Sequence, residues 1–239
     1  MKLSRRSLAV ATSAGLASLA LAVSARADET TTDLAVSCDM TIAPAVAKVG
    51  AVYRRQTGIR VRVFPTAPSL LLPQLERDIQ NDIIITRTSV LDAAEQKEIV
   101  KPGTRTGTWR NRLVIASGRS NANDIFALPD PTPGSEIDGP AVLATIGLQP
   151  ARVLGVLNTD AVAWSLQNGI AGKGLVFQTD VAAYPGLKTE RTVPDAPVLT
   201  YAAAITTLAY RGDPPAFLRF LVSPDGEAAM TSAGLEQAT

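Results

Sequence analysis

The sequence predicts an α/β protein of two lobes, each a mostly parallel sheet flanked by helices, with two crossover strands between the lobes. Three observations support this fold class. Short apolar strands alternate with helical segments, the alternation occurs in two successive blocks, and a late strand followed by helices leads the chain back to the first block. About 210 residues remain after an N-terminal export segment, which is enough to bury two small cores.

Residues 1–27 have the features of a secretory signal peptide. Arg5 and Arg6 precede an apolar run over residues 8–23, and residues 25–27, Ala-Arg-Ala, offer a small-residue cleavage site. The run is short for a bilayer span of about 20 residues, so we expect no membrane anchor. The arginine pair suits a twin-arginine signal as well as an ordinary secretory one, and either route predicts a periplasmic protein.

The first block alternates strands and helices between Leu34 and about Val100. Pro44 in the first turn and Gly58 just past the end delimit its first helix, and Ser89 with Asp92 is a capping signal for its third. The expected strands are Leu34–Ser37, Ile59–Phe64 and Asp82–Thr86, and the expected helices are Ala43–Thr57, Ser69–Gln80 and a helix from Ser89 to about Val100.

A single long strand, Trp109–Ala116, is expected to end the first block. We expect Leu199–Leu208 to be the returning strand, so lobe 1 comprises residues 28–115 and 200–239 and lobe 2 residues 116–199. The other expected elements are strands Ile125–Leu128, Arg152–Val156 and Gly174–Gln178, helices Glu136–Ile146 and Thr159–Asn168, two final helices starting at Asp213 and Ser223, and loops over Pro129–Pro140 and Pro185–Pro197.

Composition excludes several classes of function. Residues 1–27 hold four basic residues and no acidic ones, so the mature chain has 23 − 4 = 19 basic and 22 acidic residues, and we expect no nucleic-acid partner. The chain has no histidine, which excludes Ser/His/Asp and Cys/His nucleophiles and histidine-ligated metals. We therefore expect a protein that is not an enzyme and has no cofactor.

Six segments, in order along the chain, resemble a known family. They are Leu34–Met40, Phe64–Leu75, Asp82–Thr86, Asn111–Ala116, Asp130–Ser135 and Gly174–Phe177. Together they are similar to the periplasmic molybdate- and tungstate-binding proteins of ABC importers, and the likeness covers nearly all of the mature chain. The resemblance implies a type II periplasmic binding protein: a monomer that closes over a solute and presents it to an ABC permease in the membrane.

The resemblance also implies a site for a tetrahedral oxyanion, held by hydroxyls and backbone N–H groups at helix starts. Asp39 stands where the family usually has a serine, and a carboxylate repels a buried dianion unless it is protonated or paired. Arg87, just beyond the third strand, is a candidate partner for Asp39 or a cleft residue. The ligand is therefore an oxyanion by resemblance, or a neutral polar or cationic solute by the Asp39 argument. The matching positions are Asp39, Ser69, Gly134 or Ser135, Thr159, and Phe177 in place of a frequent tyrosine.

Cys38, Asp39 and Met40 have two interpretations. Thiolate and thioether ligands suit a soft metal such as Cu(I). Alternatively, Cys38 and Met40 pack in the core while Asp39 caps the following helix. We favour the second, because no histidine or second cysteine completes a tight metal site.

Two other functions stay open. The same fold can serve as an accessory or sensor protein that docks to a periplasmic enzyme or receptor instead of a permease. An enzyme that uses Cys38 with Asp39 is the least favoured, because no base for the thiol is visible. We expect the aromatic residues Trp109, Trp164, Tyr201 and Tyr210 in the core or hinge.

Overall fold

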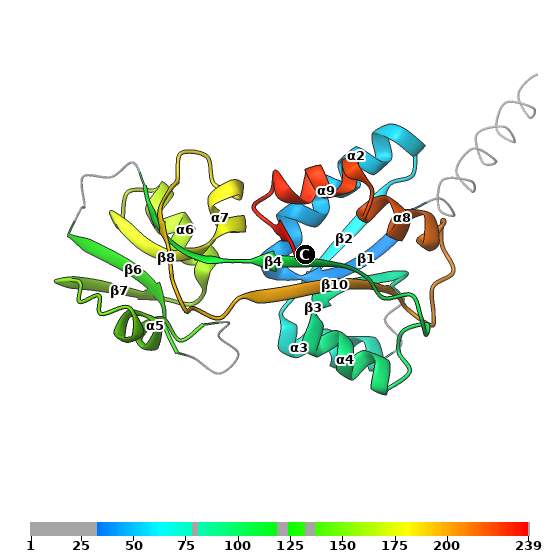
Figure 1. The fold of residues 1–239 in the computed structure, drawn as a ribbon, viewed down its shortest axis with the longest axis horizontal. Coiled ribbons are helices and arrows are strands. Elements are labelled where there is room, and N and C mark those ends of the chain that lie inside the picture. The colour runs from blue at the N-terminus through cyan, green and yellow to red at the C-terminus, as the bar shows by residue number, and fades with distance from the viewer. Residues whose placement is uncertain (1–32, 78–80, 119–123, 132–136, 239) are drawn as a thin grey trace, which may run out of the picture.

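The computed structural model describes residues 33–77, 81–118, 124–131 and 137–238, which form two lobes, each built on one sheet (Figure 1). The predicted signal peptide, residues 1–27, lies outside the described residues. Among those described, no helix is long and apolar enough to cross a membrane.

Lobe 1 holds the first and last parts of the chain. Its elements are β1 (Leu34–Asp39), the 3-10 helix η1 (Met40–Ile42), α2 (Ala43–Thr57), β2 (Val61–Thr66), α3 (Pro68–Glu76), β3 (Ile83–Arg87), α4 (Thr88–Gln96), β4 (Thr106–Asn111), β10 (Leu199–Ile205), α8 (Pro214–Leu221), α9 (Pro224–Thr231) and β11 (Glu236–Gln237). Lobe 2 holds β5 (Leu113–Ser117), β6 (Ile125–Pro129), α5 (Gly139–Thr145), β7 (Arg152–Val156), α6 (Thr159–Gln167), β8 (Lys173–Phe177), α7 (Gln178–Ala183) and β9 (Lys188–Thr192).

Both sheets are mixed. The strand order is β11-β4-β10-β3-β1-β2 in lobe 1 and β7-β6-β8-β5-β9 in lobe 2. The strands of the strand–helix–strand units are parallel: β1 to β2 and β3, and β6 to β7 and β8. The crossover strands and their neighbours are antiparallel, β10 to β3 and β4, and β5 to β8 and β9. The expectation of mostly parallel sheets thus fits the repeating units and not the strands that carry the chain between lobes.

The expected single strand Trp109–Ala116 is two strands in two sheets. β4 belongs to the lobe 1 sheet and β5 to the lobe 2 sheet, with Arg112 between them. The chain therefore leaves the first sheet at Arg112, three residues before the end of lobe 1 expected at 115. In Figure 1, β4 and β10 lie side by side where they approach the second lobe. No Gly or Pro marks this junction, so the sequence pattern gives no sign of it.

The segment Pro185–Pro197, expected to be a loop, contains the edge strand β9. All five of its residues are exposed, and its sequence, Lys-Thr-Glu-Arg-Thr, has no apolar alternation that would predict a strand. The helix α7 before it was also not predicted. It begins directly after β8, which ends at Phe177.

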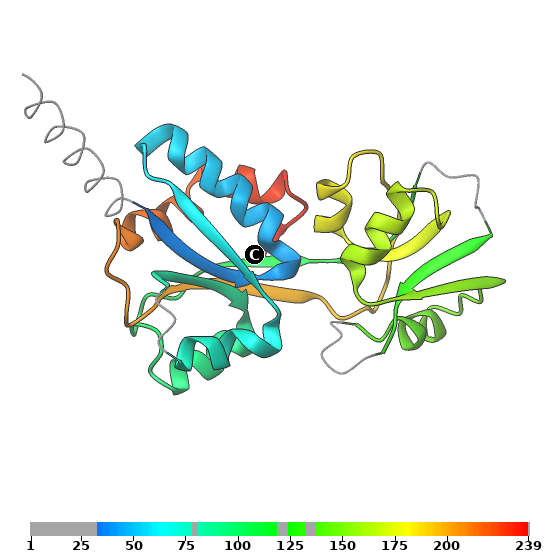
Figure 2. The ribbon, with the colours of Figure 1, turned by 180° about the vertical axis from the view of Figure 1, so that it is seen from behind.

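Helices cover both faces of each sheet (Figure 1 and Figure 2). In lobe 1, α2, α8 and α9 pack on one face and α3 and α4 on the other. Within β3, Ile83 and Ile85 contact the first group and Ile84 the second. Burial on both faces explains why this strand is an uninterrupted apolar run. In lobe 2, α5 covers one face and α6 the other.

The predicted capping residues are confirmed at the starts of α8 and α9, whereas the expected cap at Ser89 is wrong, because α4 begins at Thr88 without a side-chain cap and Ser89 lies within it. Asp213 accepts the Ala216 N–H at 2.9 Å, and Ser223 accepts the Gly226 N–H at 3.3 Å, at the starts of α8 and α9. Gly58 ends α2 in the left-handed conformation, with φ of 79°. These signals are local, which is why they could be predicted without knowledge of the tertiary structure.

Candidate functional site

A buried ion pair lies at the end of β1. The Asp39 side chain is fully buried, and its Oδ2 accepts a hydrogen bond from Arg87 Nε at 2.9 Å. Its Oδ1 accepts from the Thr41 N–H at 3.1 Å and from the Thr41 hydroxyl at 2.8 Å. Asp39 therefore caps η1, as the core-packing interpretation predicted, and it has Arg87 as the counter-charge that a buried carboxylate needs.

The strand register brings this pair together. β1 and β3 are parallel neighbours, with Cys38 opposite Ile85, so the residues that follow both strands emerge at the same carboxyl edge. Arg87 is the last residue of β3, and Asp39 is the last residue of β1. The carboxyl edge of parallel strands is where α/β sheets commonly bind ligands.

Thr41 connects the ion pair to both crossover strands and to lobe 2. Its hydroxyl lies 2.7 Å from the Tyr201 hydroxyl on β10. Its carbonyl accepts a hydrogen bond from the Thr179 hydroxyl of α7 at 3.0 Å. Thr179 in turn accepts from the Asn111 side-chain amide of β4 at 2.8 Å. The cluster of Asp39, Arg87, Thr41, Tyr201, Asn111 and Thr179 is called the junction cluster below.

A close backbone contact accompanies this cluster. Gly234, which follows α9 in lobe 1, lies against α7 of lobe 2, and a Cβ on it would be 2.5 Å from the Gln178 carbonyl oxygen. Gly234 also has φ of 92°, a conformation that favours glycine. The lobes therefore touch through the start of α7, on the same side as the Thr41–Thr179 hydrogen bond.

The other predicted ligand positions lie apart from this ion pair. Ser69 is exposed in the first turn of α3. Phe177 is fully buried in the core cluster of lobe 2, and Thr159 is buried at the start of α6. Gly134 and Ser135 lie outside the described residues. Of the predicted set, Asp39 and Arg87 are the two that the structure brings into direct contact.

Thr159 is directed to a buried carboxyl group that sequence analysis missed. Asp180, in the first turn of α7, accepts the Phe177 N–H at 2.9 Å and a hydrogen bond from the Thr159 side chain. Burial raises the pKa of Asp180 to about 7, against the lowering effect of these two hydrogen bonds. Asp180, the residue after Thr179, thus connects the starts of α6 and α7.

Cys38 and Met40 have different surroundings. Cys38 is fully buried among apolar side chains, and burial raises the pKa of its thiol, with the Asp39 charge adding to the shift. Met40 is 42% exposed, so the expectation that it packs in the core is wrong. Among the described residues, no group of three or more His, Cys, Asp or Glu side chains could hold a metal ion.

Of the four Trp and Tyr residues expected in the core or hinge, two are buried and two are exposed. Trp109 and Tyr201 are buried in the lobe 1 core, as predicted. Trp164 and Tyr210 are 51% and 63% exposed, so their expected burial is wrong. Both belong to stretches in which apolar residues are frequent, and frequency alone does not reveal which face of an element is buried.

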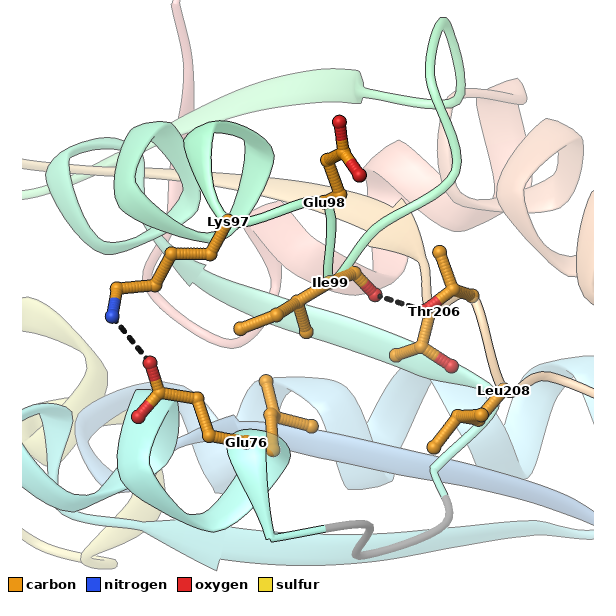
Figure 3. Close-up of a pocket in the computed structure, with 8 residues that line it drawn as sticks. Glu76, Lys97, Glu98, Ile99, Thr206 and Leu208 are labelled. Carbon is orange, nitrogen blue, oxygen red and sulfur yellow. Dashed lines mark hydrogen bonds and ion pairs between the residues drawn. The ribbon is translucent and has the colours of Figure 1, made fainter.

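A surface pocket of about 300 Å³ lies elsewhere in lobe 1 (Figure 3). Glu76 and Lys97 form an ion pair at its edge, and the Thr207 hydroxyl donates to the Ile99 carbonyl at 3.0 Å. It adjoins Thr206, just past the end of β10 that pairs with Ile83, whereas Arg87 is at the opposite end of β3. This pocket is therefore separate from the junction cluster.

Sequence analysis missed four members of the junction cluster: Thr41, Asn111, Thr179 and Tyr201. All four belong to elements that were predicted with other boundaries, β4 and β10, or were not predicted, η1 and α7. One usable signal was Asn111, an amide inside the expected strand Trp109–Ala116, because an amide that a strand buries needs hydrogen-bond partners.

Comparison with known proteins supports the family-level assignment. A family model described as bacterial extracellular solute-binding protein matches residues 34–236. No curated protein matches the chain in sequence.

Several solved structures share the fold at low sequence identity. The substrate-binding domain of a molybdenum ABC transporter from Clostridium difficile has a TM-score of 0.70 and 18% identity, over 87% of this chain and 99% of that one. The periplasmic molybdate-binding protein of Azotobacter vinelandii has a TM-score of 0.69 and 16% identity, over 86% of this chain and 100% of that one. Iron-bound HitA from Pseudomonas aeruginosa has a TM-score of 0.57 and 13% identity, over 87% of this chain and 85% of that one. These likenesses confirm the two-lobed binding-protein fold.

Proposed function

The chain belongs to the bacterial extracellular solute-binding proteins, and from this premise we propose that it is an exported, monomeric receptor for an ABC importer. In this role it captures a small solute between its lobes and presents it to a permease in the membrane. The extracellular family and the predicted signal peptide support export.

The junction cluster carries this proposal. It joins the loop after β1, both crossover strands and the start of α7, so groups from both lobes meet at one place. A solute bound beside it would contact both lobes. Such a solute stabilises the closed arrangement by the difference between its affinities for the closed and open forms.

The buried residues support binding rather than catalysis. The chain has no histidine, and Cys38 is enclosed in the core with the pKa of its thiol raised by burial, which leaves the thiol protonated at neutral pH. A thiol nucleophile requires the thiolate and access to substrate. We therefore propose that the chain has no catalytic residue.

The fold alone does not identify the solute. The similar structures include molybdate-binding and iron-bound proteins, which take solutes of opposite charge. The first loop of this chain holds a carboxylate paired with a guanidinium, so the pair is neutral and offers no net positive charge to a dianion in a desolvated site. We infer a small polar solute that places a neutral or singly charged group near Asp39 and Arg87, with exposed Ser69 as a further contact.

A thermal-shift screen of the purified protein tests this function. The panel contains molybdate, tungstate, sulfate, phosphate, small carboxylates, amino acids and sugars, and titration calorimetry confirms each hit. A solute at 100 times its Kd stabilises the native state by about 2.7 kcal/mol. The proposal predicts a hit among the neutral or singly charged solutes. Tight binding of molybdate or tungstate would contradict the inferred solute, and the absence of any hit at millimolar concentration would contradict the function.

A further inference from the structure

The Asp39 carboxylate is held by a set of hydrogen-bond donors. Three donors converge on its two oxygens: the Thr41 N–H, the Thr41 hydroxyl and the Arg87 guanidinium, at 3.1, 2.8 and 2.9 Å. A cation with two neutral donors is the set that binds a free carboxylate or oxyanion, and charge-assisted hydrogen bonds of this kind are the strong ones. We call these donors the Thr41–Arg87 cradle.

The cradle is a built site and not a chance surface pairing. Asp39 is fully buried and Thr41 is 7% exposed. The Arg87 side chain keeps 19% of its surface accessible. Tyr201 fixes the Thr41 hydroxyl from β10, and Thr179 fixes the Thr41 carbonyl from α7. Its donors are held in place by both lobes.

We propose that Asp39 acts as a built-in anion that fills an oxyanion-binding cradle formed by Thr41 and Arg87. The wild-type cradle is therefore closed to free oxyanions, and removal of the carboxylate opens it to them. The consequence for the natural solute rests on the proposed function: the solute binds next to a neutral ion pair and presents no dianionic group to the first loop.

Asp39→Ala tests the cradle directly, with formate as the probe because formate replaces the carboxylate that the substitution removes. Titration calorimetry and thermal shift at neutral pH are measured for wild type, Asp39→Ala, Asp39→Asn and the double variant Asp39→Ala with Arg87→Ala. We expect formate to bind Asp39→Ala at least tenfold more tightly than wild type, and to raise its melting temperature.

The control variants separate occupancy from charge. Asn keeps the volume of the side chain and removes its charge, so Asp39→Asn should bind formate no better than wild type. The double variant lacks the Arg87 cation, so it should not bind formate more tightly than wild type does. If Asp39→Ala does not fold, Asp39→Ser serves instead. Its short side chain leaves most of the space of the carboxylate, and when its hydroxyl caps η1 by accepting the Thr41 N–H, the Thr41 hydroxyl and Arg87 remain for formate.

Formate binding to Asp39→Ala or Asp39→Ser no tighter than to wild type would overturn the proposal. An equal gain in Asp39→Asn would also overturn it, since charge alone would then account for the effect. Both results are independent of the solute screen: the cradle can fail while a natural solute is found, and it can be confirmed while the screen finds none.

Discussion

Asp39 and Arg87 form the buried ion pair on which the first loop depends. The carboxylate is fully buried and the guanidinium keeps 19% of its side-chain surface exposed, so each is mostly removed from water. Removal of one partner leaves the other as an uncompensated charge, which costs more than the pair itself contributes. The main effect of the pair on stability is therefore that breaking it would leave one buried charge without a partner.

Arg87→Ala is expected to lower the free energy of unfolding by about 3–5 kcal/mol, because Asp39 would remain buried without a counter-charge. Urea denaturation at neutral pH measures the loss. Arg152→Ala is the matched control: Arg152 pairs with Asp124 at 2.8 Å, but both side chains are more than half exposed, so its loss should be within about 1 kcal/mol. Equal losses in the two variants would contradict a buried, charge-dependent first loop.

Asp180 predicts a pH dependence of stability. Its ordinary pKa of 3.8 rises to about 7 in the folded protein because of burial, so the folded state binds a proton between these values and the unfolded state does not. The contribution of Asp180 to stability is then most favourable below pH 4 and falls as the pH rises to 7, by up to about 4 kcal/mol.

Asp180→Asn removes this titration. The free energy of unfolding of wild type minus that of Asp180→Asn should fall between pH 4 and 7 and be constant above about pH 8. Urea denaturation of both proteins across this range checks the expectation. A difference independent of pH would show that Asp180 is ionised throughout and that its burial is compensated by hydrogen bonds.

At the scale of elements, α7 is a part of lobe 2 that contacts lobe 1 directly. Its start carries three adjacent features: the close approach of the Gln178 carbonyl to Gly234, the Thr179 hydrogen bonds to Thr41 and Asn111, and the buried Asp180. A short helix with these contacts couples lobe 2 to the first loop of lobe 1. Substitutions at the start of α7 should therefore change the arrangement of the two lobes as well as the free energy of unfolding.

Gly234→Ala places a Cβ 2.5 Å from the Gln178 carbonyl oxygen, a backbone atom that cannot move without α7. Gly58→Ala is the matched control, since Gly58 has a similar φ of 79° and nothing within 4 Å of the added Cβ. The control should cost about 1–2 kcal/mol from backbone strain alone. Gly234→Ala should cost more and increase the radius of gyration in small-angle scattering. Equal costs and an unchanged radius would contradict the lobe contact.

Thr179→Val removes the donor to the Thr41 carbonyl and the acceptor of the Asn111 amide, which leaves two buried polar groups without these partners. We expect a loss of about 1–3 kcal/mol in the free energy of unfolding. Thr145→Val is the control, because the Thr145 hydroxyl donates to the Ala141 carbonyl of its own helix and this hydrogen bond is exposed. A loss no larger than in the control would mean that the hydrogen bond between the lobes is not formed in solution.

At the scale of the whole molecule, the two-lobed fold was predictable because its signals are repetitive and local. The apolar strand Ile83–Ile85 and the caps at Asp213 and Ser223 are examples: each follows from a few neighbouring residues. The division of Trp109–Ala116 between two sheets depends on pairing with β8, β9 and β10, which are distant in sequence. The local sequence pattern does not identify those partner strands.

The candidate site was predictable only in part, for the same reason. Asp39 stood out because it stands where the resembling family usually has a serine, and Arg87, just beyond the third expected strand, was a candidate partner for Asp39. Thr41, Thr179 and Asn111 are ordinary polar residues until the fold brings residues 41, 111 and 179 together. Hydrogen bonds between residues so far apart in the chain are properties of tertiary structure.

The central claim is that the lobes close over a small solute, and small-angle X-ray scattering tests it most directly. The purified protein is measured alone and with a saturating amount of the tightest binder from the solute panel. Hinge closure predicts a smaller radius of gyration with the solute, and no such change with a solute that fails to bind. A radius that is unchanged at saturation would contradict capture between the lobes.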